Sequence, residues 1–158
     1  MITWPEEVIG FLRRPVPIFL HVAAARIGKV PFTCRGYGFA AEPESGRLGV
    51  YVLKSQWLRL NAYMEGGRET AVLLTSGVDN ESYQFKGTLQ ASRALNREDA
   101  RTIEEQRKRV YQYAPHLLPV LHVSPSGCLA IELRIRAIYS QTPEPEAGSL
   151  IAGEGAEA

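Results

Sequence analysis

The segment VDNESYQFKGTL, residues 78–89, contains the pattern that decides the fold, because apolar and polar side chains alternate along it. Tyr83 and Phe85 fall on one side of an extended chain, and Gln84 and Lys86 fall on the other. This period of two residues is typical of a strand with one face against a core. The polar face is either solvated or built to hold a polar ligand.

Six segments, including residues 82–95, are rich in β-forming residues and lie between turn signals. The connections between them are short, whereas a parallel sheet needs a helix after nearly every strand. The pattern therefore favours a small antiparallel β-barrel. The other five predicted strands are residues 17–25, 30–39, 47–53, 69–76 and 128–140.

Three helical insertions are predicted between these strands. Thr3 begins the capping-box sequence TWPE, Ser55 can cap a second helix, and Asn96 precedes a strongly helical segment with acids in its first turn. The fold class is therefore mainly β with helical insertions. The three predicted helices span residues 3–13, 55–67 and 96–114.

Length and charge predict one domain followed by a tail. The chain has 158 residues, and 45% of them are hydrophobic, which is enough to bury a continuous core. Residues 143–158 hold four acids and no base, so residues 1–142 carry a net charge of +5 within an overall +1. We expect a single domain with an N-terminal helix over residues 1–142 and a flexible acidic C-terminal tail over residues 143–158.

Several classes of partner and site are disfavoured. The sequence has no run of about 18 apolar residues, no secretory pattern at its start and no dense clusters of Lys and Arg. We therefore expect a cytoplasmic protein that binds neither membranes nor nucleic acids. Cys34 and Cys128 lie 94 positions apart without a CxxC motif, and His116 and His122 are separated by Pro119, so no metal site is predicted.

Candidate functional residues come from the cations within the β-rich segments. Arg35, Lys54 and Lys86 each lie in or at the end of such a segment, and two or three such donors can hold a phosphate. The alternative is that all three are solvated strand positions. The sequence has no GxSxG nucleophile motif, and the catalytic residues are unknown.

Four segments in the same order resemble the FMN-binding split-barrel family of pyridoxamine-5′-phosphate-oxidase-like proteins. The resemblance covers roughly residues 16–142. The segments are VPFTCRGYGFA (30–40), GVYVLKSQWLRLN (49–61), SYQFKG (82–87) and AIYSQTPEPEAG (137–148).

This resemblance implies a six-stranded antiparallel split β-barrel that forms a homodimer and binds FMN at the dimer interface. Arg35 or Lys86 would then lie near the phosphate, and Gln84 near the flavin ring. Many relatives have Lys or Arg where this chain has Gln56 and Trp57, a departure that would weaken FMN binding. The implied cofactor-binding residues are Arg35, Tyr51, Val52, Lys54, Ser55, Gln84 and Lys86.

Within the same resemblance, Tyr51 and Val52 would offer their backbone to the ring and Ser55 would lie at the phosphate end. The implied function is a small-molecule oxidoreductase whose substrate the sequence does not identify. One alternative is a cofactor-free split barrel that acts as a binding or regulatory module. Another is a barrel that holds haem or a deazaflavin, with His21 or His122 as an axial ligand to a haem.

Overall fold

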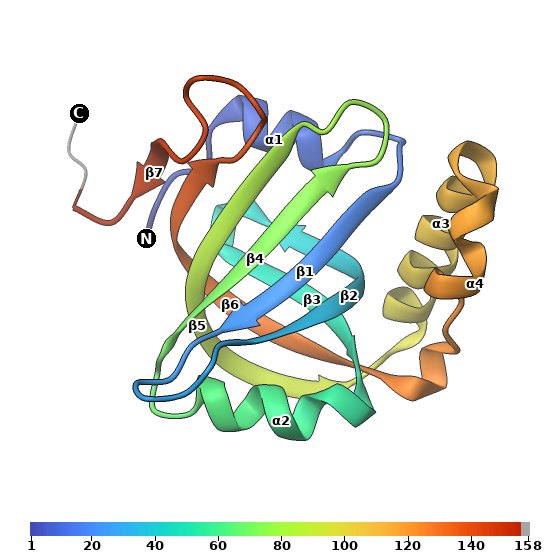
Figure 1. Cartoon of the computed structure of the whole chain (residues 1–158), viewed down its shortest axis with the longest axis horizontal. Coiled ribbons are helices and arrows are strands. Elements are labelled where there is room, and N and C mark those ends of the chain that lie inside the picture. The colour runs from blue at the N-terminus through green and yellow to red at the C-terminus, as the bar shows by residue number, and fades with distance from the viewer. Residues whose placement is uncertain (156–158) are drawn as a thin grey trace.

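A computed structural model describes residues 1–155 and shows a closed antiparallel barrel (Figure 1). The strands follow the order β3-β2-β1-β4-β5-β6-β7, and an additional pairing between β3 and β6 closes the first six into a barrel. The predicted six-stranded barrel is therefore confirmed, with one extra strand. The strands are β1 Ile18–Ala24, β2 Phe32–Glu42, β3 Arg47–Leu53, β4 Glu69–Ser76, β5 Ser82–Ala94, β6 Cys128–Ser140 and β7 Leu150–Gly153.

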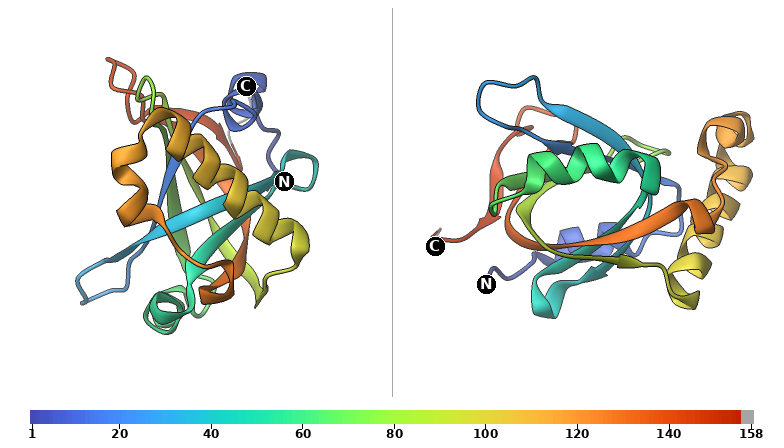
Figure 2. Two further views of the ribbon diagram at one scale, coloured as in Figure 1. Left: turned by 90° about the vertical axis from the view of Figure 1, so that its right-hand side faces the viewer. Right: turned by 90° about the horizontal axis from the view of Figure 1, so that it is seen from below.

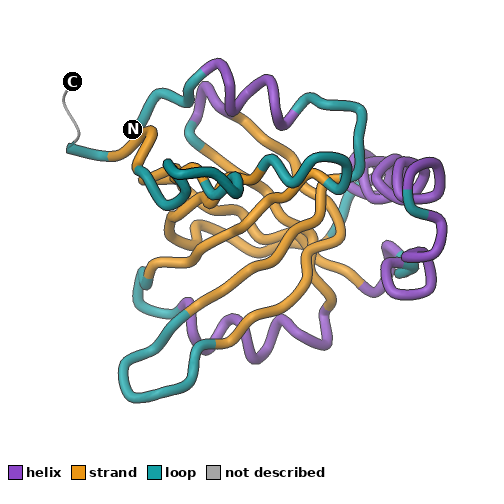
Figure 3. Tube along the Cα trace, turned by 45° about the horizontal axis from the view of Figure 1, so that its top comes forward, coloured by secondary structure: helices purple, strands orange, loops and turns teal. Residues whose placement is uncertain are grey.

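The helices surround the barrel at its two ends and on one side (Figures 1 and 3). Helix α1 lies at one end, α2 crosses the opposite end, and α3 runs along the side with α4 next to it (Figure 2). Three short 3-10 turns complete the connections. The helices are α1 Glu6–Leu12, α2 Lys54–Met64, α3 Arg97–Tyr113 and α4 Leu118–Leu121, and the 3-10 turns are Pro43–Ser45, Pro115–Leu117 and Pro125–Gly127.

The predicted helix caps are right for α3 and wrong for α1 and α2. Asn96 accepts a hydrogen bond from the backbone of Asp99, whose carboxylate in turn accepts from the backbone of Asn96, which is a complete capping box. Thr3 is not a cap, because the buried residues before α1 stay extended and Pro5 is the N-cap. Ser55 is not a cap either, since α2 begins one residue earlier and its N-cap is Leu53, without a side-chain bond.

The barrel interior is filled by the alternating residues of the strands. Phe85 is fully buried, and its ring centroid lies 5.2 Å from that of Trp4, which reaches the core from the segment before α1. At the same end Phe11 of α1 packs edge-on against Tyr83, with 5.0 Å between ring centroids. The N-terminal segment and α1 therefore close one end of the barrel and complete its core.

Gly87 allows β5 and β6 to approach each other where their register shifts. A Cβ atom at this position would lie 2.1 Å from the carbonyl oxygen of Arg134, far inside van der Waals contact. Only glycine fits a backbone approach this close. The end of the SYQFKG segment therefore has a steric role in closing the barrel.

Strand β7 lies within the segment for which the sequence predicted a tail. Its Gly153 pairs with Ala137 of β6, and Glu154 accepts a 2.7 Å hydrogen bond from Arg136. Residues 150–154 therefore contact the barrel, although the sequence indicated no strand there. Residues 156–158, including the predicted tail acid Glu157, lie outside the described residues, and the flexibility of the tail stays a prediction.

Two further findings concern the cysteines and the helices. Both cysteines are free and buried, and burial raises the pKa of the Cys34 thiol to about 11. Across residues 1–155, no helix combines the length and the apolar character needed to cross a membrane.

Candidate functional site

A row of side chains crosses the outer face of four neighbouring strands. His21 of β1 pairs with Arg35 of β2 on one side and with Leu73 of β4 on the other, and Leu73 pairs with Gln84 of β5. Residues paired directly across strands point to the same side of a sheet. Because their neighbours Leu20 and Leu74 fill the core, these four side chains point outward.

Two of the predicted cofactor-binding residues, Arg35 and Gln84, stand at the two ends of this row. Arg35 and Gln84 lie three strand spacings apart, which is about 14 Å along the sheet. Lys86 lies on the same face, two residues beyond Gln84 on β5. Because β2 and β5 are three steps apart in a closed ring of six strands, Arg35 points outward on one side of the barrel and Gln84 and Lys86 point outward on the opposite side.

The charge of Lys86 is partly engaged within the chain. Its Nζ atom lies 3.8 Å from a carboxylate oxygen of Glu69 and 4.8 Å from the centroid of the Tyr139 ring. Glu69 is largely exposed, so this ion pair is weak. Lys86 can exchange its carboxylate partner for another anion at little cost.

Arg35 is available for a ligand. Among the described residues, its guanidinium has no salt bridge and no side-chain hydrogen bond. It lines a hollow where β1 and β2 meet α3, together with His21, Gln106 and Arg107. Partial burial, and then the neighbouring Arg35 charge, lower the pKa of His21 below its ordinary value, so the imidazole is neutral at pH 7.

The same face has an apolar character around its polar row. In the described chain no helix covers β1 and β4 on this side (Figure 1). The outward residues of these two strands are mostly small or apolar and half-exposed. They include Phe19, Ala23, Ala71 and Leu73. We call the outer surface of β1 and β4, which includes His21, the open face; Arg35 flanks it on β2, and Gln84 and Lys86 flank it on β5.

Tyr51 and Val52 do not lie on the open face. The side chain of Val52 is fully buried in the barrel core. Tyr51 points outward from β3 but is covered by α3, where its hydroxyl donates a 2.8 Å hydrogen bond to Asp99. Strand β3 has neighbours on both sides, β2 and β6, so its backbone at these residues is not an open edge. Their predicted contact with a flavin ring stays a prediction.

Lys54 and Ser55 lie on a different element, in the first turn of α2. The Nζ atom of Lys54 donates a 2.9 Å hydrogen bond to the carbonyl oxygen of Ser126, and Ser55 is exposed. Trp57, at the position where the resemblance implied a base, packs against the barrel core. The predicted residues thus fall into three groups: the edges of the open face, the start of α2 and the covered part of β3.

Sequence reasoning missed His21 as a member of the row, because its place between Arg35 and Leu73 depends on the strand register. The signal was its outward position in an alternating strand. The predicted haem ligand role of His21 or His122 stays a prediction. His122 lies with its Nδ1 atom 3.3 Å from Arg107, on the α3 and α4 side of the molecule.

Among the comparisons with known proteins, only the comparison of structures finds similar proteins. No family model and no curated protein matches the chain. General stress protein 26 from Bacillus anthracis str. Sterne has a TM-score of 0.51 at 15% identity, with 88% of this chain and 94% of that chain covered.

Two other solved structures give similar values. A putative pyridoxamine 5′-phosphate oxidase from Lactobacillus delbrueckii has a TM-score of 0.52 at 11% identity, covering 87% of this chain and 93% of its own. A pyridoxamine 5′-phosphate oxidase-related, FMN-binding protein from Nostoc punctiforme has a TM-score of 0.51 at 10% identity, covering 90% and 86%. At these identities the similarity shows a shared fold.

Proposed function

The chain has the split-barrel fold of pyridoxamine 5′-phosphate oxidase-like proteins, and from this premise we propose that it is a homodimer that binds FMN. The open face would form the dimer interface, and the flavin would lie in it. The bound flavin would carry out a redox reaction on a small molecule. The chain would then act as an oxidoreductase of the cytoplasm.

The observation that carries this proposal is the guanidinium of Arg35 beside the open face, which no described residue pairs. A phosphate monoester is the partner that a free, half-buried guanidinium favours, because two charge-assisted hydrogen bonds can form at once. Gln84 in the same row offers an amide donor and acceptor to the polar edge of a flavin ring. Arg35 therefore supplies a donor that fits a phosphorylated cofactor, and Gln84 supplies a second polar group at the opposite edge of the open face.

The uncovered apolar residues of the open face support the dimer. Contiguous apolar surface on a soluble protein marks an interaction site, and a second copy of the same face covers it with two-fold symmetry. Leu73 and Ala71 lie near the middle of this surface, on β4. A cofactor between two such faces is shielded from water by both.

The flavin would supply the electron transfer, and the chain would supply position and charge. Arg35 would hold the phosphate, and Lys86 would add a second positive charge after leaving Glu69. The neutral imidazole of His21 is next to Arg35 in the row and can accept or donate a hydrogen bond. The proposed cytoplasmic location is supported by the free thiols of Cys34 and Cys128, since reducing compartments keep thiols unpaired.

The test is to incubate the purified protein with FMN, remove free flavin by gel filtration and record the visible spectrum. We expect a yellow protein with one FMN per chain, and light scattering should give the mass of two chains. Retention of no flavin at a protein concentration of tens of micromolar would contradict cofactor binding. A monomer mass at the same concentration would contradict the shared site.

A cofactor-free binding module is the second candidate, and a specific feature favours it. Three of the predicted contacts are engaged within the chain: Lys54 with Ser126, Lys86 with Glu69 and Tyr51 with Asp99. A dimer that retains no flavin but gains thermal stability with another phosphorylated metabolite would support this second function.

A further inference from the structure

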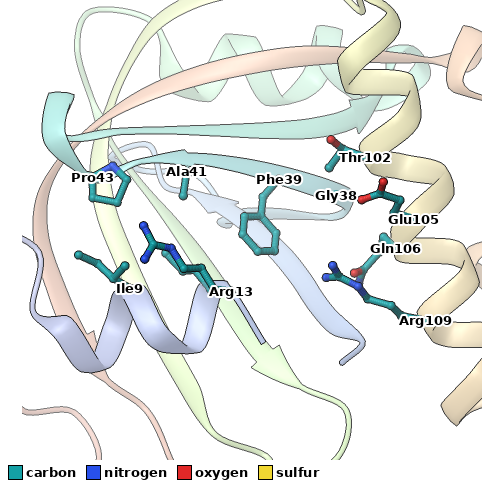
Figure 4. Close-up of a pocket in the computed structure, with 11 residues that line it drawn as sticks. Ile9, Arg13, Gly38, Phe39, Ala41, Pro43, Thr102, Glu105, Gln106 and Arg109 are labelled. Carbon is teal, nitrogen blue, oxygen red and sulfur yellow. The ribbon is translucent and has the colours of Figure 1, made fainter. Parts of the chain in front are cut away.

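A second cavity adjoins the hollow of Arg35, with which it shares Gln106, in the angle between α1, β2 and α3 (Figure 4). Its volume is about 250 Å³, just below the range of about 300–1,000 Å³ that is typical of small-molecule sites. Its floor is apolar and includes Ile9, Leu12 and Phe39. We call it the α1–α3 cleft.

One face of α3 supplies the polar wall of the cleft. Thr102, Glu105, Gln106 and Arg109 are spaced three and four residues apart, so they lie on the same side of the helix. The amide nitrogen of Gln106 donates a hydrogen bond to the carbonyl oxygen of Ile18, which fixes this wall to β1. The cleft is therefore held by contacts between α3 and the barrel.

Two arginines from different helices line the cleft without partners. Within residues 1–155, neither Arg13, the C-cap of α1, nor Arg109 of α3 makes a salt bridge or a side-chain hydrogen bond. The adjacent Arg14, by contrast, pairs with both Asp79 and Glu81. Ion pairs within the described chain thus do not neutralise the charges of Arg13 and Arg109.

The net charge of the cleft lining favours the binding of an anion. Glu105 is the only carboxylate among the described residues that line the cleft, so the lining carries a net charge of +1. The ring of Phe39 lies between the side chains of Arg13 and Arg109 (Figure 4). An apolar body on this ring would bring an attached anionic group toward the two guanidinium groups. Each guanidinium can form paired hydrogen bonds with a carboxylate or a phosphate.

We propose that the α1–α3 cleft binds a small organic anion with a flat apolar body, such as an aromatic carboxylate or an aryl phosphate. Arg13 and Arg109 hold the anionic group, and Phe39 with Ile9 packs against the body. This site is next to the Arg35 hollow, with which it shares Gln106, and the proposal does not depend on flavin binding. The ligand is a substrate or an effector, and in either case the two arginines would bind its anionic group and Phe39 its apolar body.

The experiment titrates the flavin-free, full-length protein with benzoate, phenyl phosphate and the neutral benzamide, following amide chemical shifts. We expect saturable shifts near Phe39 and Arg109 with one or both anions, and at least tenfold weaker binding of benzamide. A preference for benzoate would identify a carboxylate ligand, and a preference for phenyl phosphate would identify a phosphate ester. The shifts in the unaltered protein locate the site without any substitution.

Arg109→Gln and Arg13→Gln should each weaken binding of the preferred anion at least tenfold. Arg101→Gln is the matched control, because Arg101 is exposed on the same helix and does not line the cleft. It should leave the affinity within twofold. Melting temperatures without ligand show that each variant is folded.

Three results would overturn the proposal. The first is no saturable shift with either anion at 10 mM, and the second is benzamide binding as tightly as the anions. The third is unchanged affinity in both Arg13→Gln and Arg109→Gln. If one of these variants does not fold, the other variant and the chemical-shift map still decide the outcome.

Discussion

The hydroxyl of Tyr51 donates a 2.8 Å hydrogen bond to Asp99, and this bond joins the middle of β3 to the first turn of α3. Asp99 also accepts from Arg93 and from the backbone of Asn96, although it is only 4% exposed. One buried carboxylate thus caps the helix, pairs with a base and anchors the helix to the barrel. The position of α3 beside the open face depends on this group.

Tyr51→Phe should lower the free energy of unfolding by about 1–2 kcal/mol, because it removes a buried hydrogen bond and keeps the ring. Urea unfolding monitored by circular dichroism measures the change. Tyr113→Phe is the control, since Tyr113 is exposed at the end of α3 and should change stability by less than about 0.5 kcal/mol. Equal stability of the two variants would show that the bond does not anchor α3.

Acid should remove the contribution of Asp99. Burial alone would raise its pKa, but hydrogen bonds from Arg93, Asn96 and Tyr51 outweigh it and hold the pKa below the ordinary 3.8. A carboxyl whose pKa is lowered by folding stabilises the fold above its unfolded pKa and loses that effect as the pH falls through its folded value. The stabilisation is therefore complete above about pH 4 and declines below it.

Asp99→Asn tests this linkage. At pH 7 the variant should be less stable than the unaltered protein by about 2 kcal/mol or more, since the Arg93 pairing loses its charge. The difference should narrow as the pH falls from 4 to 2, as followed by urea midpoints at each pH. Glu44→Gln, at an exposed glutamate, should show a difference near zero at every pH. A stability difference between Asp99→Asn and the unaltered protein that stays the same at every pH would contradict the linkage.

The sequence predicted much of the fold because local patterns agreed with the tertiary structure. The alternation around Phe85 and Gln84 places one residue in the core and the other outside, as observed, and Asn96 caps α3. Strand β7 was missed, since four residues, Leu150–Gly153, carry little local signal and depend on pairing with β6. Local propensity does not report such long-range pairing.

The site was less predictable, because its groups meet only through register and helix packing. The resemblance implied that Tyr51 offers its backbone to a flavin ring, but nothing in the sequence indicated that α3 covers its side chain. Arg13 and Arg109 lie 96 positions apart and meet at one cleft only because α1 and α3 both pack near β2. No spacing rule links residues of this kind before the fold is known.

Gly87→Ala should disturb the closure of the barrel. The added Cβ would lie 2.1 Å from a backbone oxygen of β6, and the backbone cannot move aside as a flexible side chain can. We expect a loss of at least about 2 kcal/mol in the free energy of unfolding. Gly10→Ala is the control: Gly10 lies in α1 with no atom within 4 Å of the new Cβ, so this change should stabilise the protein by about 0.5–1 kcal/mol.

Leu73→Glu should break the proposed dimer without unfolding the chain. Leu73 is half-exposed on the open face, so a carboxylate is tolerated in the monomer but would be buried without a partner between two copies. Light scattering at increasing concentrations should show at least a hundredfold weaker association. Leu58→Glu is the control, because Leu58 is 82% exposed on α2, away from this face. Equal association of both variants would place the dimer interface elsewhere.

Arg35→Gln should weaken FMN binding about tenfold to a hundredfold, because a charge-assisted contact to a phosphate contributes about 1.5–3 kcal/mol. Riboflavin lacks the phosphate, so its affinity should be nearly the same in the variant and the unaltered protein. Flavin fluorescence titrations of both ligands measure the two effects separately. Arg26→Gln, in the exposed turn between β1 and β2, controls for the loss of one positive charge from the chain. An equal loss of affinity for riboflavin and FMN would mean that Arg35 contacts the ring or supports the fold, and the phosphate would then be held elsewhere.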